Sequence, residues 1–192
     1  TCGPWTQQSM RWIPPELWEE NFRREVDDED LVGRAGYGGL DLSSVSDITA
    51  WGLVFPSPGP DDGGLDIVAR FWCPESRLTD PENRYAEQYQ AWQRAGVLTT
   101  TPGNAIDYQF IRAQILEDAS QYQLVDLNVD RLFQGYQLAM ELQDEGLTVF
   151  GMGQGFLSMA PAMKTFERLM LDRKLNHGGK QVLGWMARNV AV

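Results

Sequence analysis

Apolar residues gather along the chain in short runs that predict five β-strands. Residues 37–42 and 48–55 are two such runs, and the short polar turn between them is typical of a β-hairpin. The second run is almost continuously apolar, so we expect a strand covered on both faces. After a stretch rich in Pro, Gly and Asp, residues 65–73 alternate in polarity, which predicts a third strand antiparallel to the second. Residues 124–129 and 147–152 predict the last two strands.

Helical spacing of apolar residues occupies much of the remaining chain. Asp107 and Ser158 stand where N-caps of two helices are expected. Helices are predicted at 16–24, 83–94, 107–120, 131–145 and 161–172, with a further short helix near the C-terminus. An antiparallel meander followed by strand–helix alternation predicts an α/β fold with a mixed sheet. Residues 37–42 should be central in that sheet, between 48–55 and 124–129.

One acid, Asp41, interrupts the first predicted strand where a core residue is expected. A carboxylate in such a position is costly unless it is paired, hydrogen-bonded or bound to a metal. The simpler alternative is a turn aspartate whose side chain caps the loop at residues 43–46. Asp126 lies within the fourth predicted strand and Asp130 at its end. Either acid could lie beside Asp41 if that strand pairs parallel with the first one through a helical crossover.

Composition favours one globular α/β domain. The chain has 192 residues, 43% of them hydrophobic, which is enough to bury a sizeable core. It contains no apolar run of the roughly 20 residues that span a bilayer, and no signal-peptide pattern. Because the chain begins with Thr1 and not with an initiator Met, we expect an excised fragment. Cys2 and Cys73 form no metal-binding spacing with His177, which argues against structural zinc and favours a reducing cytosol.

The net charge of −11 argues against a protein that coats nucleic acid. The charge is uneven, however, because residues 164–188 hold six basic and two acidic side chains, a local balance of +4. That segment is either an ordinary solvated helix face or an edge that contacts phosphates. The glycine-rich residues 151–155 lack the Gly-Lys-Ser/Thr ending of a phosphate-binding loop, which excludes that class of NTPase and kinase.

Four motifs carry a resemblance to a known family. Residues 39–50, Gly-Leu-Asp-Leu-Ser-Ser-x-x-Asp-Ile-Thr-Ala, resemble the start of the nuclease domain of tailed-bacteriophage large terminase subunits, DNA-packaging proteins with a ribonuclease H-like fold. Similar motifs follow in the family's order at 129–132, at 154–164, and at 175–178 together with 185–189. The resemblance covers roughly residues 33–192. It implies a ribonuclease H-like mixed β-sheet flanked by helices over residues 37–192, preceded by a linker and packing helix in residues 1–36.

The resemblance also implies a site for two Mg²⁺ or Mn²⁺ ions. Asp41 would bridge the ions, and Asp130, preferred to Asp126, would hold one of them. Asp47 matches the family's aspartate in the following turn and would be a ligand or support one. The family's third catalytic aspartate lies beyond the motif that ends at Asn189, and this chain ends at Val192. The resemblance therefore implies that the C-terminal end of the domain is missing and that this fragment is weakly active or inactive.

The expected function is metal-dependent cleavage of double-stranded, concatemeric DNA during virus packaging in the host cytoplasm. Expected partners are duplex DNA, the ATPase motor domain, the portal and the small terminase subunit, with no membrane. Arg173, Lys174 and Lys180 are candidate DNA contacts. His177, the only histidine, is either a core or capping residue or a group near the scissile phosphate.

Two other functions stay open at this point. The chain could be a non-catalytic docking module of a packaging motor, which the absent third acid and the acidic composition favour. It could also be another ribonuclease H-like nuclease, such as a resolvase or transposase. The terminase-like tail around Trp185 argues against the second alternative.

Overall fold

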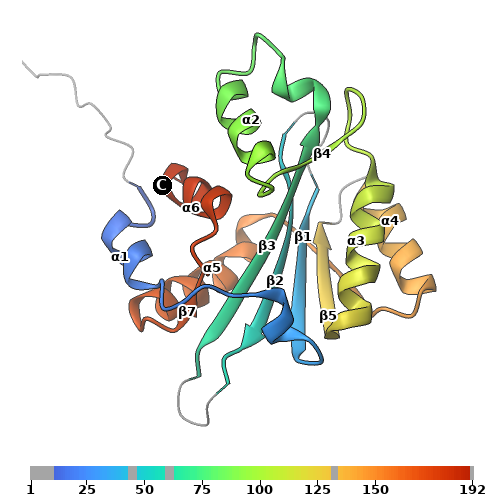
Figure 1. The fold of residues 1–192 in the computed structure, drawn as a ribbon. Coiled ribbons are helices and arrows are strands. Elements are labelled where there is room, and N and C mark those ends of the chain that lie inside the picture. Colours follow the sequence, from blue (N-terminus) through green and yellow to red (C-terminus); the bar gives the residue numbers. More distant parts are fainter. Residues whose placement is uncertain (1–10, 43–46, 59–62, 131–133, 191–192) are drawn as a thin grey trace, which may run out of the picture.

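The computed structural model describes residues 11–42, 47–58, 63–130 and 134–190. A mixed sheet runs through the centre of the molecule, with helices on both faces (Figure 1). Its strands are β1 (Ala35–Asp41), β2 (Thr49–Pro56), β3 (Leu65–Pro74), β4 (Thr99–Thr101), β5 (Gln123–Asp130), β6 (Val149–Met152) and β7 (Leu175–Asn176). They lie in the order β4-β3-β2-β1-β5-β6, and β7 pairs with one end of β3.

The central position of β1 confirms the sequence-based topology. β1 pairs antiparallel with β2 and parallel with β5, while β2 pairs antiparallel with β3. β6 continues the parallel half of the sheet beside β5. The predicted α/β class, with its ribonuclease H-like mixed sheet flanked by helices, is therefore confirmed. The two shortest strands, β4 and β7, were not predicted, because three and two residues are too few to show a periodic pattern.

The helices form two layers. They are α1 (Pro15–Glu20), α2 (Ala86–Arg94), α3 (Tyr108–Gln121), α4 (Gln134–Asp144), α5 (Phe156–Leu171) and α6 (Gln181–Asn189), with short 3₁₀ helices η1 (Asp28–Leu31) and η2 (Glu75–Leu78). α3 and α4 pack against the main core on one face of the sheet, whereas α2, α5 and α6 pack against the other. The predicted start of α4 at Arg131 lies outside the described residues.

Three predicted helix boundaries were wrong, and the first is the start of α2, which lies at Ala86 and not at residue 83. α5 begins at Phe156 and not at Pro161, because the carbonyl of Gly155 already accepts the backbone N–H groups of Ser158 and Met159. Ser158 is therefore a first-turn residue and not the N-cap. Pro161 lies inside the helix, where its missing N–H removes one hydrogen bond. α1 ends at Glu20 because the next residue, Asn21, turns its side chain to the carbonyls of Leu17 and Met170.

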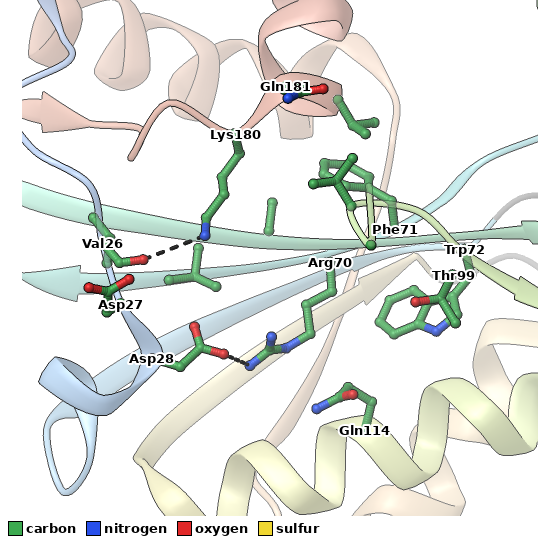
Figure 2. Close-up of a pocket in the computed structure, with 15 residues that line it drawn as sticks. Val26, Asp27, Asp28, Arg70, Phe71, Trp72, Thr99, Gln114, Lys180 and Gln181 are labelled. Atoms are coloured by element: carbon green, nitrogen blue, oxygen red, sulfur yellow. Dashed lines mark hydrogen bonds and ion pairs between the residues drawn. The ribbon is translucent and has the colours of Figure 1, made fainter. Parts of the chain in front are cut away.

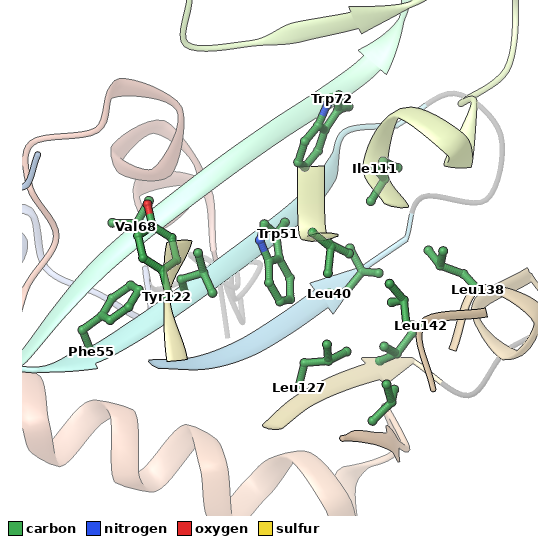
Figure 3. Close-up of a cluster of buried hydrophobic side chains, with 14 of the residues drawn as sticks. Leu40, Trp51, Phe55, Val68, Trp72, Ile111, Tyr122, Leu127, Leu138 and Leu142 are labelled. Atoms are coloured by element: carbon green, nitrogen blue, oxygen red, sulfur yellow. The ribbon is translucent and has the colours of Figure 1, made fainter. Parts of the chain in front are cut away.

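The main core lies between the sheet and the layer of α3 and α4 (Figure 3). Trp51, Leu53 and Phe55 of β2 point into it and are fully buried. The intervening residues of β2 are only half-buried, so the expectation that this strand is covered on both faces was wrong in part. The apolar run of β2 thus supplies one face to the main core, and its other face is more open.

Gly38 and Gly39 offer a matched test of this packing. A Cβ on Gly38 would come within 2.2 Å of the Trp51 ring and 2.9 Å of the Leu127 Cβ, whereas a Cβ on Gly39 would meet nothing within 4 Å. Gly38→Ala is therefore expected to lower the free energy of unfolding by about 1–3 kcal/mol. Gly39→Ala should leave it unchanged or raise it slightly. Urea unfolding of both variants checks this, and equal losses would contradict the packing of Trp51 over β1.

Candidate active site

The carboxyl ends of the three parallel strands β1, β5 and β6 meet at one end of the sheet. Leu40 of β1 is in register with Val129 of β5, so the next residues, Asp41 and Asp130, end their strands side by side. Neighbouring strands are about 4.8 Å apart, which places the two acids on adjacent positions. Asp130 is in turn in register with Met152 of β6. The fold therefore brings together two acids that are far apart in the sequence.

Asp41 and Asp130 also share a face of the sheet. Leu40 and Val129 are buried in the main core beneath α3 and α4. Because side chains alternate along a strand, the residues that follow them point to the opposite face. Asp41 is exposed there and Asp130 is half-buried. The two carboxylates can thus act on the same bound molecule.

Asp126 lies apart from this pair. It is half-buried on the same face as Asp130, but it is in register with Tyr37. Tyr37 precedes Asp41 by four residues, which is about 13 Å along a strand. The geometry therefore supports the choice of Asp130 over Asp126 as the partner of Asp41.

Gln154 adds a polar contact that the sequence analysis did not assign to the site. Its Nε2 atom donates a hydrogen bond to Oδ1 of Asp41 at 3.2 Å. The residue follows the end of β6 by two positions, so each of the three parallel strands contributes to this corner of the sheet. Its membership of the motif at residues 154–164 was the available signal. Gln154 thus contacts the Asp41 carboxylate from the segment that follows β6.

The sheet face beside Asp41 is open. Gly39 of β1 and Gly52 of β2 are cross-strand partners, and a Cβ at Gly39 would meet no atom within 4 Å. Tyr37 of β1 and Phe150 of β6, which lie near Gly39 on the same face of the sheet, are about half exposed. Because no helix or loop of the described chain covers these residues, a large substrate has room next to the carboxylates.

Asp47, the other acid of the first motif, is exposed at the start of β2. It lines a recess of about 430 Å³ together with Arg77, Arg84 and Tyr89, which belong to η2, α2 and the residues between them. Asp47 thus lies at the rim of this recess, three positions before Ala50, the cross-strand partner of Asp41. The loop at 43–46, which Asp41 would cap if it were a simple turn residue, lies outside the described residues.

His177 is part of the packing between the N-terminal segment and β7. Its side chain is buried, stacks on Trp18 with ring centroids 4.2 Å apart, and accepts a hydrogen bond on Nδ1 from the backbone N–H of Gly179. Nε2 then carries the proton and donates to the carbonyl oxygen of Trp18 at 2.9 Å. Burial lowers the pKa of His177, which favours this neutral form. These contacts favour the core role among the two alternatives for His177.

The neighbouring Asn176 has a similar structural role. Its side chain donates to the buried carboxylate of Asp66 and accepts the backbone N–H of Arg23. Asp66 also forms ion pairs with Arg24 and Arg34. The motif at residues 175–178 therefore ties the N-terminal segment to β3. The predicted division into a linker with a packing helix (1–36) and a nuclease domain (37–192) stays a prediction.

The three candidate DNA-binding cations are not gathered around the carboxylates. Arg173 forms an ion pair with Glu20, and the carbonyl of Lys174 accepts the N–H of Leu65 at the start of β3. Leu65 pairs with Pro56 of β2. The β2 partner of Asp41 is Ala50, which lies six residues from Pro56, a distance of about 20 Å along the strand. Lys180 points instead to the carbonyl of Val26, 3.5 Å away (Figure 2).

Lys180 borders a cavity of about 320 Å³ at the outer side of β3, where Arg70 is the second cation (Figure 2). Arg70 forms ion pairs with Asp28 and with the buried Asp118. Burial acts to lower the pKa of Arg70, but hydrogen bonds to Asp118 and the charges of both acids outweigh it and raise that pKa above its ordinary value. Arg70 is thus fully charged and stabilises the fold.

Among the residues that the structure describes, no group of three or more His, Cys, Asp or Glu side chains is arranged to hold a metal ion. The same part of the chain contains no helix with the length and apolar character that crossing a membrane requires. Within this part of the chain, Asp41 and Asp130 are thus a pair of candidate metal ligands and not part of a larger cluster.

Comparison with known proteins identifies the family. The family model for the terminase large subunit, endonuclease domain, matches residues 1–192. The chain is 37% identical over 161 residues to the large terminase subunit of Enterobacteria phage HK97, covering 83% of this chain and 31% of that protein. It is also 29% identical over 128 residues to protein YmfN of Escherichia coli K12, covering 65% and 28%.

The fold comparison agrees. The crystal structure of the HK97 bacteriophage large terminase matches 95% of this chain with a TM-score of 0.80 and 33% identity. The match covers 37% of that longer chain, so the present chain spans about a third of the relatives' length. On the match of its whole length to the family model, the chain belongs to the endonuclease domain family of terminase large subunits.

Proposed function

We propose that this domain cuts double-stranded, concatemeric DNA during virus packaging by metal-dependent hydrolysis of a phosphodiester bond. The observation that supports it best is the pair Asp41 and Asp130, side by side at the ends of β1 and β5 on an open face of the sheet. Family membership supports an endonuclease in general terms. The position of the acids supports this end of β1 and β5 as the proposed place of the reaction.

The donor set at this position fits Mg²⁺ or Mn²⁺. These hard cations prefer oxygen ligands, and Mg²⁺ is commonly held by only one or two carboxylates together with water and substrate phosphates. Asp41 would bridge two ions and Asp130 would hold one of them. Asp47 keeps its predicted role as a ligand or a supporting acid. When bound, such a pair of ions supplies charge neutralisation at the attacking and leaving oxygens of an in-line displacement.

The chain's own residues contribute orientation and electrostatics. Gln154 donates to one oxygen of Asp41 and leaves the other for a cation. The two like charges repel a DNA phosphate until cations are bound, which reconciles a DNA substrate with the net charge of −11. The ATPase motor domain, the portal and the small terminase subunit are the proposed protein partners, and the host cytoplasm is the proposed location.

Metal binding by variants of the two candidate acids tests this site. Asp130→Asn is expected to weaken Mn²⁺ binding at least about tenfold, because the amide removes a charged ligand. Asp126→Asn is the matched control, since it removes the same charge from the same strand about 13 Å away. Isothermal titration calorimetry measures both. Equal affinities for the two variants would contradict the site, and a non-catalytic docking module would then be the better account.

A further inference from the structure

Two adjacent apolar side chains stand almost fully in solvent at the start of α5. Phe156 is 85% exposed and Leu157 is 89% exposed, more than any other large hydrophobic residue in the described part of the chain. Single exposed apolar residues are common, but a neighbouring pair of this size suggests a binding surface. The pair contributes nothing to the packing of this domain.

The pair lies beside the carboxylates. Phe156 follows Gln154, the donor to Asp41, by two residues, so their Cα atoms are at most about 7.6 Å apart. A large apolar groove of about 700 Å³ lies further along the same helix, lined by Pro161, Phe166 and other residues, but it includes neither Phe156 nor Leu157. The pair is therefore a separate feature at the rim of the candidate active site.

The local charge is also unusual. Residues 146–163 contain no Asp, Glu, Lys or Arg, although 22% of the chain is charged. Backbone N–H groups at the start of α5 can still hydrogen-bond a phosphate. The side chains of Phe156 and Leu157 themselves offer DNA only apolar surface, which the bases can match.

Resting on the proposed function, we infer that Phe156 and Leu157 form an apolar wedge that enters duplex DNA at a base step next to the phosphate at Asp41 and Asp130. A phosphate at the carboxylates brings the rest of the duplex against the start of α5. The stacked bases are the apolar surface that duplex DNA offers, and side chains such as Phe and Leu reach it by partly unstacking a step. The wedge would bend or open the duplex where it is cut.

The test compares two substrates in the full-length protein with Mn²⁺. The double variant Phe156→Ala/Leu157→Ala is expected to cleave plasmid duplex about tenfold more slowly than the unchanged protein. Its cleavage of single-stranded circular DNA, in which no base step needs to be opened, should stay near the unchanged rate. The salt dependence of duplex binding should also stay the same, because no ionic contact is removed.

Leu171→Ala is the matched control, because Leu171 is a 57% exposed leucine at the other end of the same helix. Thermal unfolding should be the same for all variants, since the changed side chains are exposed. Unchanged duplex cleavage by the double variant would overturn the wedge and point to a protein partner for the pair. An equal loss on both substrates would overturn it as well. Failure of the proposed function would be seen separately, as cleavage that survives Asp41→Ala.

Discussion

Asp41→Asn is expected to slow Mn²⁺-dependent cleavage of plasmid DNA by the full-length protein by about a thousandfold or more. Phosphodiester hydrolysis needs charge neutralisation at the attacking and leaving oxygens together, and a bridging carboxylate supports both positions. The amide keeps the size of the side chain and its contact with Gln154 but removes the charge. Conversion of supercoiled plasmid to nicked and linear forms, followed over time with and without chelator, measures the effect.

Asp126→Asn is again the control, and it should cleave at nearly the unchanged rate because Asp126 lies level with Tyr37 and not with Asp41. Chelator should abolish cleavage by the unchanged protein without altering its unfolding, since the main core is built from apolar side chains and does not depend on a metal ion. Cleavage by Asp41→Asn at the unchanged rate would show that Asp41 is only a turn residue. The domain would then be better explained as a docking module.

The largest expected effect on stability comes from Asp118→Ala, which should lower the free energy of unfolding by about 3 kcal/mol. Asp118 is 1% exposed and accepts hydrogen bonds from Trp51 Nε1 at 2.9 Å and from two guanidinium nitrogens of Arg70 at 2.9 and 2.7 Å. Its removal leaves the indole N–H without an acceptor and weakens the pairing of a half-buried cation. Asp28 keeps one ion pair with Arg70 and limits the loss.

Glu117→Ala is the matched control for this prediction. Glu117 is the preceding residue of α3 and an exposed acid, so its removal should change the unfolding free energy by less than about 0.5 kcal/mol. Urea unfolding monitored by tryptophan fluorescence measures both variants, and Trp51 is itself a partner of Asp118. A loss of less than about 1 kcal/mol for Asp118→Ala would contradict the buried network.

The central half of the fold could be predicted from the sequence because its signals are local. The apolar runs of β1, β2 and β5 are long enough to show strand character, and the crossover through α3 explains why β5 lies beside β1. Asp41 could be selected because it interrupts an apolar run, whereas Asp130 was preferred to Asp126 on the family resemblance. Their adjacency then follows from the parallel register.

The features that escaped prediction depend on contacts between distant residues. Asp118 looks like one more polar residue on a helix, and its partner Arg70 lies 48 positions away. Asn176 and Asp66 are separated by 110 positions, so the structural role of that motif had no local signal. Gln154 was visible only as a motif member, because its partner lies 113 positions earlier on another strand.

A crystal structure of the protein soaked in Mn²⁺, with anomalous scattering recorded at the manganese edge, tests the central claim most directly. The account predicts an anomalous peak between the carboxylates of Asp41 and Asp130, within about 2.5 Å of an oxygen of each. The account would be contradicted by soaked crystals in which solvent reaches the Asp41 carboxylate but no peak lies beside it. A peak at Asp126 instead would contradict it as well.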